Sequence, residues 1–159
     1  MTPCGYVDTN YTLVMNDRTP VMPSVIAREC YALALRRAAR AVSRRYDEAF
    51  RALDLNNGQF SMLSLIAGLG PVRMTTLAER LEMDRTTVTA ALKPLVRRGL
   101  IGVEVSPSDP RGRDALLTRA GKSVLARAVP IWVGLQAELD ANMSAAQSKH
   151  LRTALQLLQ

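Results

Sequence analysis

The chain has 159 residues, of which 48% are hydrophobic and only 4% are aromatic, and its formal net charge is +7. This length fits one globular domain with helical extensions, and its apolar runs are too short and too often broken by polar residues to span a bilayer. The N-terminus has no basic region followed by an apolar run, so we expect no signal peptide and a cytoplasmic location.

The positive charge is concentrated in one part of the chain. Residues 85–127 contain nine lysines and arginines but only three acidic residues, which accounts for nearly the whole excess. A basic segment favours a polyanionic partner, and a solvated basic face is the alternative. Cys4, Cys30 and His150 do not have the spacing of a metal site, and no phosphate-binding glycine loop or catalytic triad is recognisable. We therefore expect no metal, no cofactor and no enzymatic activity.

The N-terminal part of the chain predicts a tail followed by one long helix. Residues 1–22 mix proline, glycine and asparagine without a period, which is typical of disorder. From Ser24, a candidate N-cap, to Ala52, apolar residues recur at spacings of three and four between many arginines. Such a helix is too long for one small domain to cover, so we expect it to pack against a second subunit.

Three shorter helices are predicted next. The first covers residues 59–68, and Val72 to Met74 form a very short strand. The second begins near Thr76, which has capping-box spacing with Glu79. After a tight turn at residues 82–84, the third helix runs from Arg85 to about residue 98, with Pro94 bending it and Gly99 ending it.

A hairpin and two helices complete the prediction. Residues 100–105 form one strand, residues 106–113 a charged turn, and residues 114–118 the second strand. A helix over residues 118–142 is interrupted at Pro130, and Ser144 with Gln147 begins a last helix. The expected fold is mainly α with a small β-hairpin, a winged helix-turn-helix with long N- and C-terminal dimerisation helices. Its parts are the tail at 1–22, an N-terminal dimerisation helix at 23–56, the winged helix-turn-helix DNA-binding domain at 57–118 and C-terminal dimerisation helices at 119–159.

The helix after the tight turn and the hairpin carry the residue types that contact duplex DNA. A helix-turn-helix places the start of its second helix in the major groove, where Arg85 can bond guanine and threonine methyls can contact thymine. An arginine at a hairpin tip can enter a narrow minor groove, and we expect Asp109 to orient Arg111 or Arg113 through a charge-assisted bond. The candidate DNA-binding residues are Arg85, Thr86, Thr87, Thr89, Lys93, Asp109, Arg111 and Arg113. A plain amphipathic helix and a solvated turn are the alternatives.

These segments resemble the multiple-antibiotic-resistance regulator (MarR) family. The similar stretches are Leu77 to Leu81, residues 99–101, Asp109 to Arg113, and Leu117-Thr118-Arg119-Ala120-Gly121, and the resemblance extends over roughly residues 25–158. It implies a homodimer joined by its first and last helices, with Arg111 in the minor groove and a palindromic double-stranded DNA operator. Members of this family mostly repress, and many release DNA when a small phenolic or other aromatic acid binds. For this chain we expect a small-molecule effector that is an aromatic acid or a thioester.

Other residues are candidates for effector binding or redox sensing. Trp132, Met62 and Ile66 are candidate walls of an effector pocket, with ordinary core packing as the alternative. Cys30 lies in the first helix, where some members of the resembled family carry a peroxide-sensing cysteine, and buried packing is the alternative. A redox-sensing repressor and a winged-helix protein-interaction module are therefore the competing functions, and Cys30 as an enzymatic nucleophile lacks a nearby base in the sequence.

Overall fold

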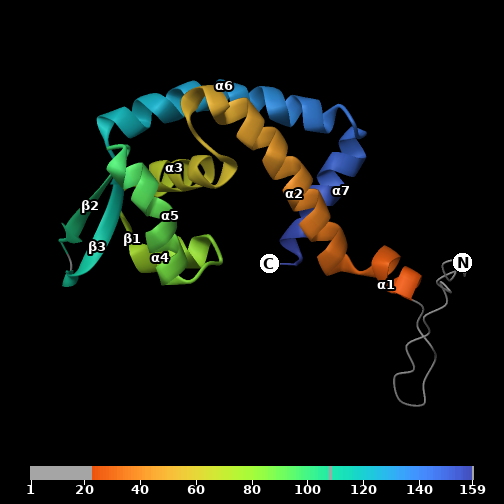
Figure 1. Ribbon diagram of the computed structural model, residues 1–159, viewed down its shortest axis with the longest axis horizontal. Coiled ribbons are helices and arrows are strands. Elements are labelled where there is room, and N and C mark those ends of the chain that lie inside the picture. The colour runs from red at the N-terminus through yellow and green to blue at the C-terminus, as the bar shows by residue number, and fades with distance from the viewer. Residues whose placement is uncertain (1–22, 108, 159) are drawn as a thin grey trace, which may run out of the picture. The chain divides into compact units, whose positions relative to one another are not determined.

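The computed structural model describes residues 23–107 and 109–158, so the predicted disordered tail and Cys4 lie outside the described residues. The chain divides into two compact units, of which the first ends at Ser43 and the second begins at Arg44. Figure 1 follows the helices and strands in chain order. The second unit contains the sheet and most of the helices, and it is the part that carries the candidate site.

The long first helix is not continuous. It forms as α1 (Pro23–Glu29) and α2 (Tyr31–Phe50), followed by the short 3-10 helix η1 (Arg51–Leu53). Cys30 lies between the first two, although its N–H still donates to the carbonyl of Ile26 at 2.9 Å. The prediction of one uninterrupted helix over residues 24–52 was wrong, because apolar periodicity indicates which face is buried and does not report local breaks.

Helix α3 (Asn57–Leu69) begins two residues before its predicted start, because Asn56 caps it. The Asn56 side chain accepts a hydrogen bond from the Gln59 N–H at 2.8 Å, and the Gln59 side chain accepts one from the Asn56 N–H at 3.1 Å. This reciprocal capping box satisfies two backbone donors that would otherwise lack partners.

The helix-turn-helix consists of α4 (Met74–Arg80) and α5 (Arg85–Arg97), preceded by the two-residue strand β1 (Val72–Arg73). The predicted capping box of Thr76 and Glu79 does not form, because α4 starts directly from β1 and Thr76 lies inside its first turn. Helix α5 begins at Arg85 as predicted and continues through Pro94. Gly99 then adopts a left-handed backbone with φ of 66°, which glycine accepts without strain.

The sheet contains three antiparallel strands in the order β1-β3-β2, with β2 (Ile101–Ser106) and β3 (Asp109–Leu117) forming the hairpin. The prediction of a turn over residues 106–113 was wrong, since β3 already starts at Asp109. Ser106 pairs with Asp109 and Val105 pairs with Arg113, so residues 110–112 form a bulge without ladder partners. Pro110 fits there because a bulged residue needs no ladder N–H.

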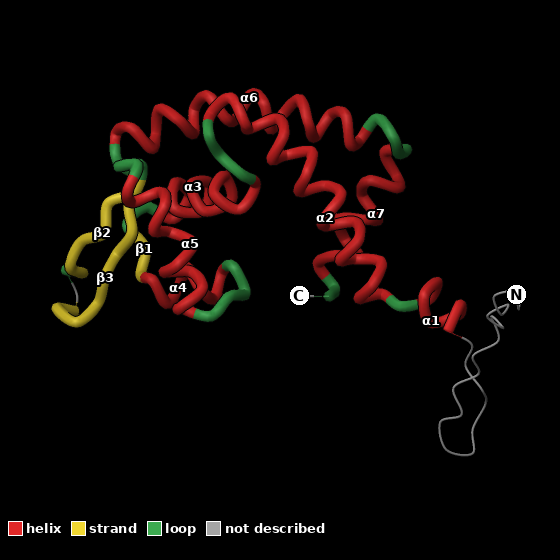
Figure 2. The backbone as a smooth tube through the Cα atoms, viewed as in Figure 1, coloured by secondary structure: helices red, strands yellow, loops and turns green. Residues whose placement is uncertain are grey.

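Two helices complete the chain, α6 (Arg119–Asp140) and α7 (Ala145–Gln156). Thr118 caps α6, and the helix continues through Pro130. The sequence predicted an interruption at this proline, and the helix has no break there. Ser144 and Gln147 form the predicted capping box at the start of α7. The apolar core of the second unit lies among α3, α4, α5 and the sheet, which contact one another (Figure 2). Its largest fully buried side chains include Phe50, Leu63, Leu77, Leu92 and Leu95.

Candidate nucleic-acid interface

The start of α5 presents a polar face to solvent. Asp84 caps the helix by accepting a hydrogen bond from the Thr87 N–H at 2.8 Å, and its other carboxylate oxygen accepts one from the Thr87 hydroxyl. These hydrogen bonds to the charged form lower the pKa of Asp84. The cap fixes the first turn of α5 and leaves Arg85 and Thr86 exposed at the helix end.

The two faces of α5 differ in the way that a DNA-reading helix requires. Val88, Leu92 and Leu95 are buried against the core, so the predicted residues Thr89 and Lys93 lie on the exposed side. The Thr89 hydroxyl donates to the carbonyl of Arg85 at 2.8 Å, which holds this side chain along the helix. The threonines at 87 and 89 thus keep their methyl groups and acceptor lone pairs for a ligand, while their hydroxyl hydrogens are engaged.

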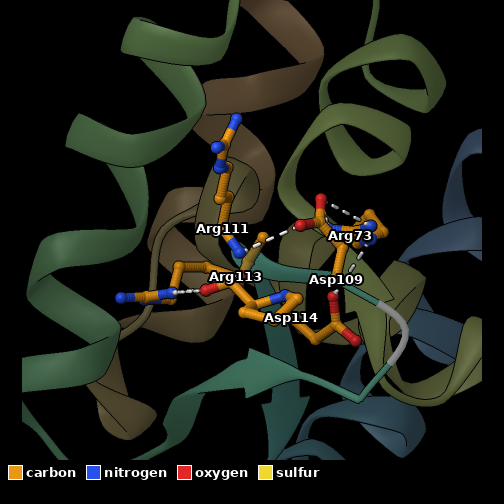
Figure 3. A network of polar contacts seen from close by, with 7 residues as sticks. Arg73, Asp109, Arg111, Arg113 and Asp114 are labelled. Carbon is orange, nitrogen blue, oxygen red and sulfur yellow. Dashed lines mark hydrogen bonds and ion pairs between the residues drawn. The ribbon is translucent and has the colours of Figure 1, made fainter.

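The three charged residues that were predicted for the hairpin lie in and beside the bulge of β3, with Arg111 inside it and Asp109 and Arg113 at its two ends (Figure 3). One Asp109 oxygen accepts a hydrogen bond from the Arg111 backbone N–H at 2.9 Å, and this bond is the largest cause of the lowered pKa of Asp109. The Arg113 guanidinium folds back onto the hairpin and donates to the carbonyls of Gly112 and Pro110 at 3.0 and 3.3 Å. Figure 3 shows the Arg111 guanidinium pointing away from Asp109.

The predicted charge-assisted bond between Asp109 and Arg111 forms at the Arg111 backbone N–H, and the Arg111 guanidinium takes no part in it. The second Asp109 oxygen instead accepts hydrogen bonds from both terminal nitrogens of Arg73, at 3.3 and 3.2 Å. Asp109 therefore orients Arg111 through the backbone, and the guanidinium of Arg111 has no acidic partner among the described residues.

Residues from α5 and from the hairpin meet in a single groove of about 320 Å³. Arg85 comes from the first position of α5 and Arg111 from the bulge, so the helix and the hairpin present their cations to the same space. The groove is lined by Arg73, Met74, Thr75, Arg85, Asp109, Arg111, Gly112 and Arg113. Four guanidinium groups against one carboxylate make it a strongly positive concavity, which attracts phosphate.

Known proteins match this arrangement. The family model described as MarR family matches residues 55–112. The transcriptional regulator MosR of M. tuberculosis, solved in complex with DNA, is 36% identical, with 79% of this chain and 92% of that chain covered and a TM-score of 0.70. The chain belongs to the MarR family. The transcriptional repressor CouR, solved with a 23-mer DNA duplex, is 28% identical over 84% of this chain and 94% of its own, with a TM-score of 0.77. The transcriptional regulator HosA of Escherichia coli is 28% identical over 96 residues, which are 60% of this chain and 71% of HosA.

MarR-family membership confirms the predicted fold class, a winged helix-turn-helix within a mainly helical chain with a small sheet. The matched proteins HosA and MosR are transcriptional regulators, and transcriptional regulators are a class of binding protein. No helix in the described part of the chain has the length and apolar character that crossing a membrane requires. Among the described residues, no three histidine, cysteine or acidic side chains gather as metal ligands would.

Arg73 is the charged residue of the groove that the sequence prediction missed, and Met74, Thr75 and Gly112 were not predicted to line it either. Arg73 lies on β1 directly opposite Asp114 of β3, and its Nε is 3.7 Å from an Asp114 carboxylate oxygen. The only signal in the sequence is a cation in a short strand and an acid 41 residues later. Without the strand register, nothing distinguishes that pair from any other arginine and aspartate.

An apolar pocket of about 550 Å³ lies among α3, β3 and α6. Its lining residues are Ile66, Ala67, Gly70, Pro71, Leu116, Leu117, Lys122, Leu125, Ala126 and Val129. Of the three residues predicted to form a pocket wall, only Ile66 lines it. Met62 is buried in the core, and Trp132 is 37% exposed on α6, three residues beyond Val129. Lys122 gives the pocket one cationic group.

Cys30, the predicted redox candidate, is a free and half-buried cysteine between α1 and α2. Its nearest neighbours in sequence are Glu29, which pairs with Arg28 at 2.9 Å, and the exposed Tyr31. A redox cysteine needs a cation that stabilises its thiolate. Arg28, the cation near Cys30 in the sequence, is paired with Glu29 instead.

Proposed function

We propose that this chain is a homodimeric repressor that binds a palindromic double-stranded DNA operator through the groove between α5 and the bulge of β3. The observation that carries the proposal is the convergence of Arg85 and Arg111 on one positive groove, from two elements that contact different grooves of DNA in winged helices. The DNA duplexes bound to MosR and to CouR support it.

The residues have different roles in this proposal. Arg85 at the exposed start of α5 bonds a guanine edge in the major groove, and Thr86, Thr87 and Thr89 supply methyl and acceptor contacts beside it. Arg111 enters the minor groove, where negative potential is strongest. Lys93 and Arg113 neutralise phosphates, and Asp109 orients the bulge without touching DNA.

Exposed apolar side chains support a dimer built from the terminal helices at residues 23–56 and 119–159. On α6, Val129 and Val133 are 44% and 53% exposed beside Trp132, and α7 exposes Leu151 and Leu155. Such residues at helical spacing need cover, and a second copy of the chain supplies it. Two heads on a two-fold axis then require two half-sites at fixed spacing.

DNA binding is tested by selecting bound duplexes from a random library and measuring the affinity of the enriched sequence by fluorescence anisotropy. Arg111→Ala is expected to weaken binding to all duplexes and to lower the salt dependence of log K by about 0.9 for each phosphate that is no longer neutralised. Arg85→Ala is expected to reduce discrimination at one base pair by about 1–3 kcal/mol.

The matched control is Arg127→Ala, because Arg127 is an exposed arginine of α6 that does not line the groove and its loss changes the net charge equally. This variant should bind DNA almost as the native protein does. The proposal fails if no duplex is enriched, or if Arg85→Ala and Arg111→Ala bind no worse than the control. Recovery of a protein partner without DNA would favour the interaction module.

The apolar pocket supports release by a small-molecule effector with an apolar body and an anionic group. Its walls accept an aromatic ring, and Lys122 is positioned for a carboxylate or phosphate. A second CouR structure, which is 25% identical with a TM-score of 0.76, contains p-coumaroyl-CoA. A ligand that prefers a head spacing different from that of DNA releases the operator.

The effector test adds salicylate, p-coumarate or p-coumaroyl-CoA to the labelled complex of protein and DNA. Release by one of them that is abolished in Ala126→Trp, which fills the pocket, supports this site. Release by cumene hydroperoxide that disappears in Cys30→Ser would instead support the redox-sensing alternative.

A further inference from the structure

The guanidinium of Arg73 is held between two carboxylates of β3. Asp109 accepts from its terminal nitrogens at 3.3 and 3.2 Å, and Asp114 lies 3.7 Å from its Nε. The Asp114 side chain is 13% exposed and that of Arg73 is 33% exposed. Two hydrogen bonds to Asp109 and an ion pair with the buried carboxylate of Asp114 orient the guanidinium, because the donors of arginine are arranged in a rigid fork.

The backbone of the bulge crosses this guanidinium at Gly112. A Cβ atom at that position would lie 1.4 Å from Nη1 of Arg73 and 2.6 Å from its Cζ. Gly112 does not have a positive φ, so a side chain here meets no backbone strain, but it would displace the Arg73 guanidinium. Gly112 is buried although it belongs to an exposed hairpin, which agrees with close packing against Arg73.

In the sequence, Arg111 lies between Asp109 and Gly112, the two residues that meet the Arg73 guanidinium. Its own N–H donates to Asp109, whose other oxygen binds Arg73, and the next residue is Gly112. Residues 110–112 lack ladder partners on β2, so strand pairing does not hold this part of β3. Arg73 contacts this part of β3 instead, through its two hydrogen bonds to Asp109 (Figure 3).

We propose that Arg73 is a positioning residue, which holds Arg111 toward DNA through Asp109 and Gly112 without being a DNA contact itself. This inference rests on the proposed function, because it concerns the alignment of the same groove. Arg73 ends β1 and immediately precedes α4, so it also joins the helix-turn-helix to the hairpin that carries Arg111. Lysine would not replace it, since one ammonium group cannot reproduce the fork that engages both acids.

The test uses Gly112→Ala, which disturbs the Arg73 guanidinium without changing any charge. We expect the affinity of this variant for the selected duplex to fall about tenfold, as a misplaced groove residue would cause. Gly102→Ala in β2 is the matched control, because its Cβ would meet the Leu116 side chain at an ordinary 3.6 Å. The control should bind as the native protein does.

The decisive comparison is between single and double variants. In an Arg73→Ala chain the space beside Gly112 is open, so adding Gly112→Ala should cause no further loss of affinity. In an Arg111→Ala chain, adding Arg73→Gln, which removes the charge, should also cause little further loss and leave the salt dependence unchanged. The unfolding midpoint of each variant is measured beside its affinity, and the comparison of single and double variants uses those that remain folded at the assay temperature.

Three results overturn the inference. The first is native affinity for Gly112→Ala, and the second is a pair of losses that multiply when Gly112→Ala is added to Arg73→Ala. The third is a salt dependence of log K that falls by about 0.9 when Arg73→Gln is added to Arg111→Ala. The last result would make Arg73 a phosphate ligand. Failure of the proposed function is distinct, because the native chain would then bind no selected duplex at all.

Discussion

Gly121→Ala is expected to disrupt the junction where the hairpin ends and α6 begins. A Cβ at this position would lie 2.1 Å from the Leu100 carbonyl oxygen and 3.1 Å from a methyl of Leu117, whereas ordinary contacts of this kind begin at 3.4 Å. The carbonyl would have to move by more than an ångström. It accepts hydrogen bonds from the Thr118 N–H at 3.1 Å and from the Thr118 hydroxyl at 3.2 Å, and both would weaken.

The magnitude of this effect follows from three contributions. Overpacking costs about 1–3 kcal/mol, and each weakened hydrogen bond costs about 0.5–1.5 kcal/mol. The helix propensity of alanine over glycine returns about 1 kcal/mol. We therefore expect Gly121→Ala to lower the free energy of unfolding by about 1–5 kcal/mol, and the central value of about 3 kcal/mol corresponds to roughly 10 °C in the midpoint for a unit of this size.

The assay is thermal unfolding followed by circular dichroism at one fixed protein concentration, because a dimer makes the midpoint depend on concentration. Gly68→Ala in α3 is the control, since no atom lies within 4 Å of the added Cβ and the helix should be equally or more stable. An unchanged midpoint for Gly121→Ala would refute the reasoning that close approach of the backbone requires glycine here.

Three further results are expected. Phe50 is fully buried and stacks on Phe60 at 4.6 Å, so Phe50→Ala should cost about 3–5 kcal/mol in urea unfolding; a loss below about 1 kcal/mol would contradict this. Ser144→Ala removes the α7 cap and should cost about 1 kcal/mol in the same assay, with Ser144→Thr as the conservative control. Hydrogen bonds from Arg111 and Arg73 lower the pKa of Asp109, so its stabilisation is complete above the ordinary aspartate pKa of about 3.9 and is lost as the pH falls through the lowered value. Asp109→Asn should accordingly be less stable than the native chain at neutral pH and show a smaller loss in acid, and equal loss in both would contradict this assignment.

Local signals in the sequence were sufficient for most helices. Ser144 with Gln147, and Gly99 after the apolar face of α5, are short-range patterns whose physical effect involves only neighbouring residues. The α5 start at Arg85 and the polar face beyond it were also predictable, because helical spacing separates Val88 and Leu92 from the exposed side.

Apart from the local break of the first helix at Cys30, the remaining errors concern contacts between segments distant in sequence. Pro110 and Gly112 are typical of a turn, yet β2 pairs with β3 as far as Asp109, and β1 pairs with its other edge at Asp114 and Ala115. The same long-range pairing starts α4 at Met74 and puts Arg73 beside its acids. Strand register between distant segments cannot be read from local propensity, and the pocket walls beyond Ile66 escaped prediction for the same reason.

The pairing of β1 with β3 sets where this DNA-reading head can be transplanted into a chimeric regulator. The similarity to the family model ends at residue 112, in the middle of β3, and a fragment cut there would lose every ladder bond from Arg113 onward. A fragment that starts after Arg73 would lack the strand that anchors the opposite edge. A functional graft therefore has to begin before Val72 and continue past Gly121, where the Leu100 carbonyl packs against the start of α6.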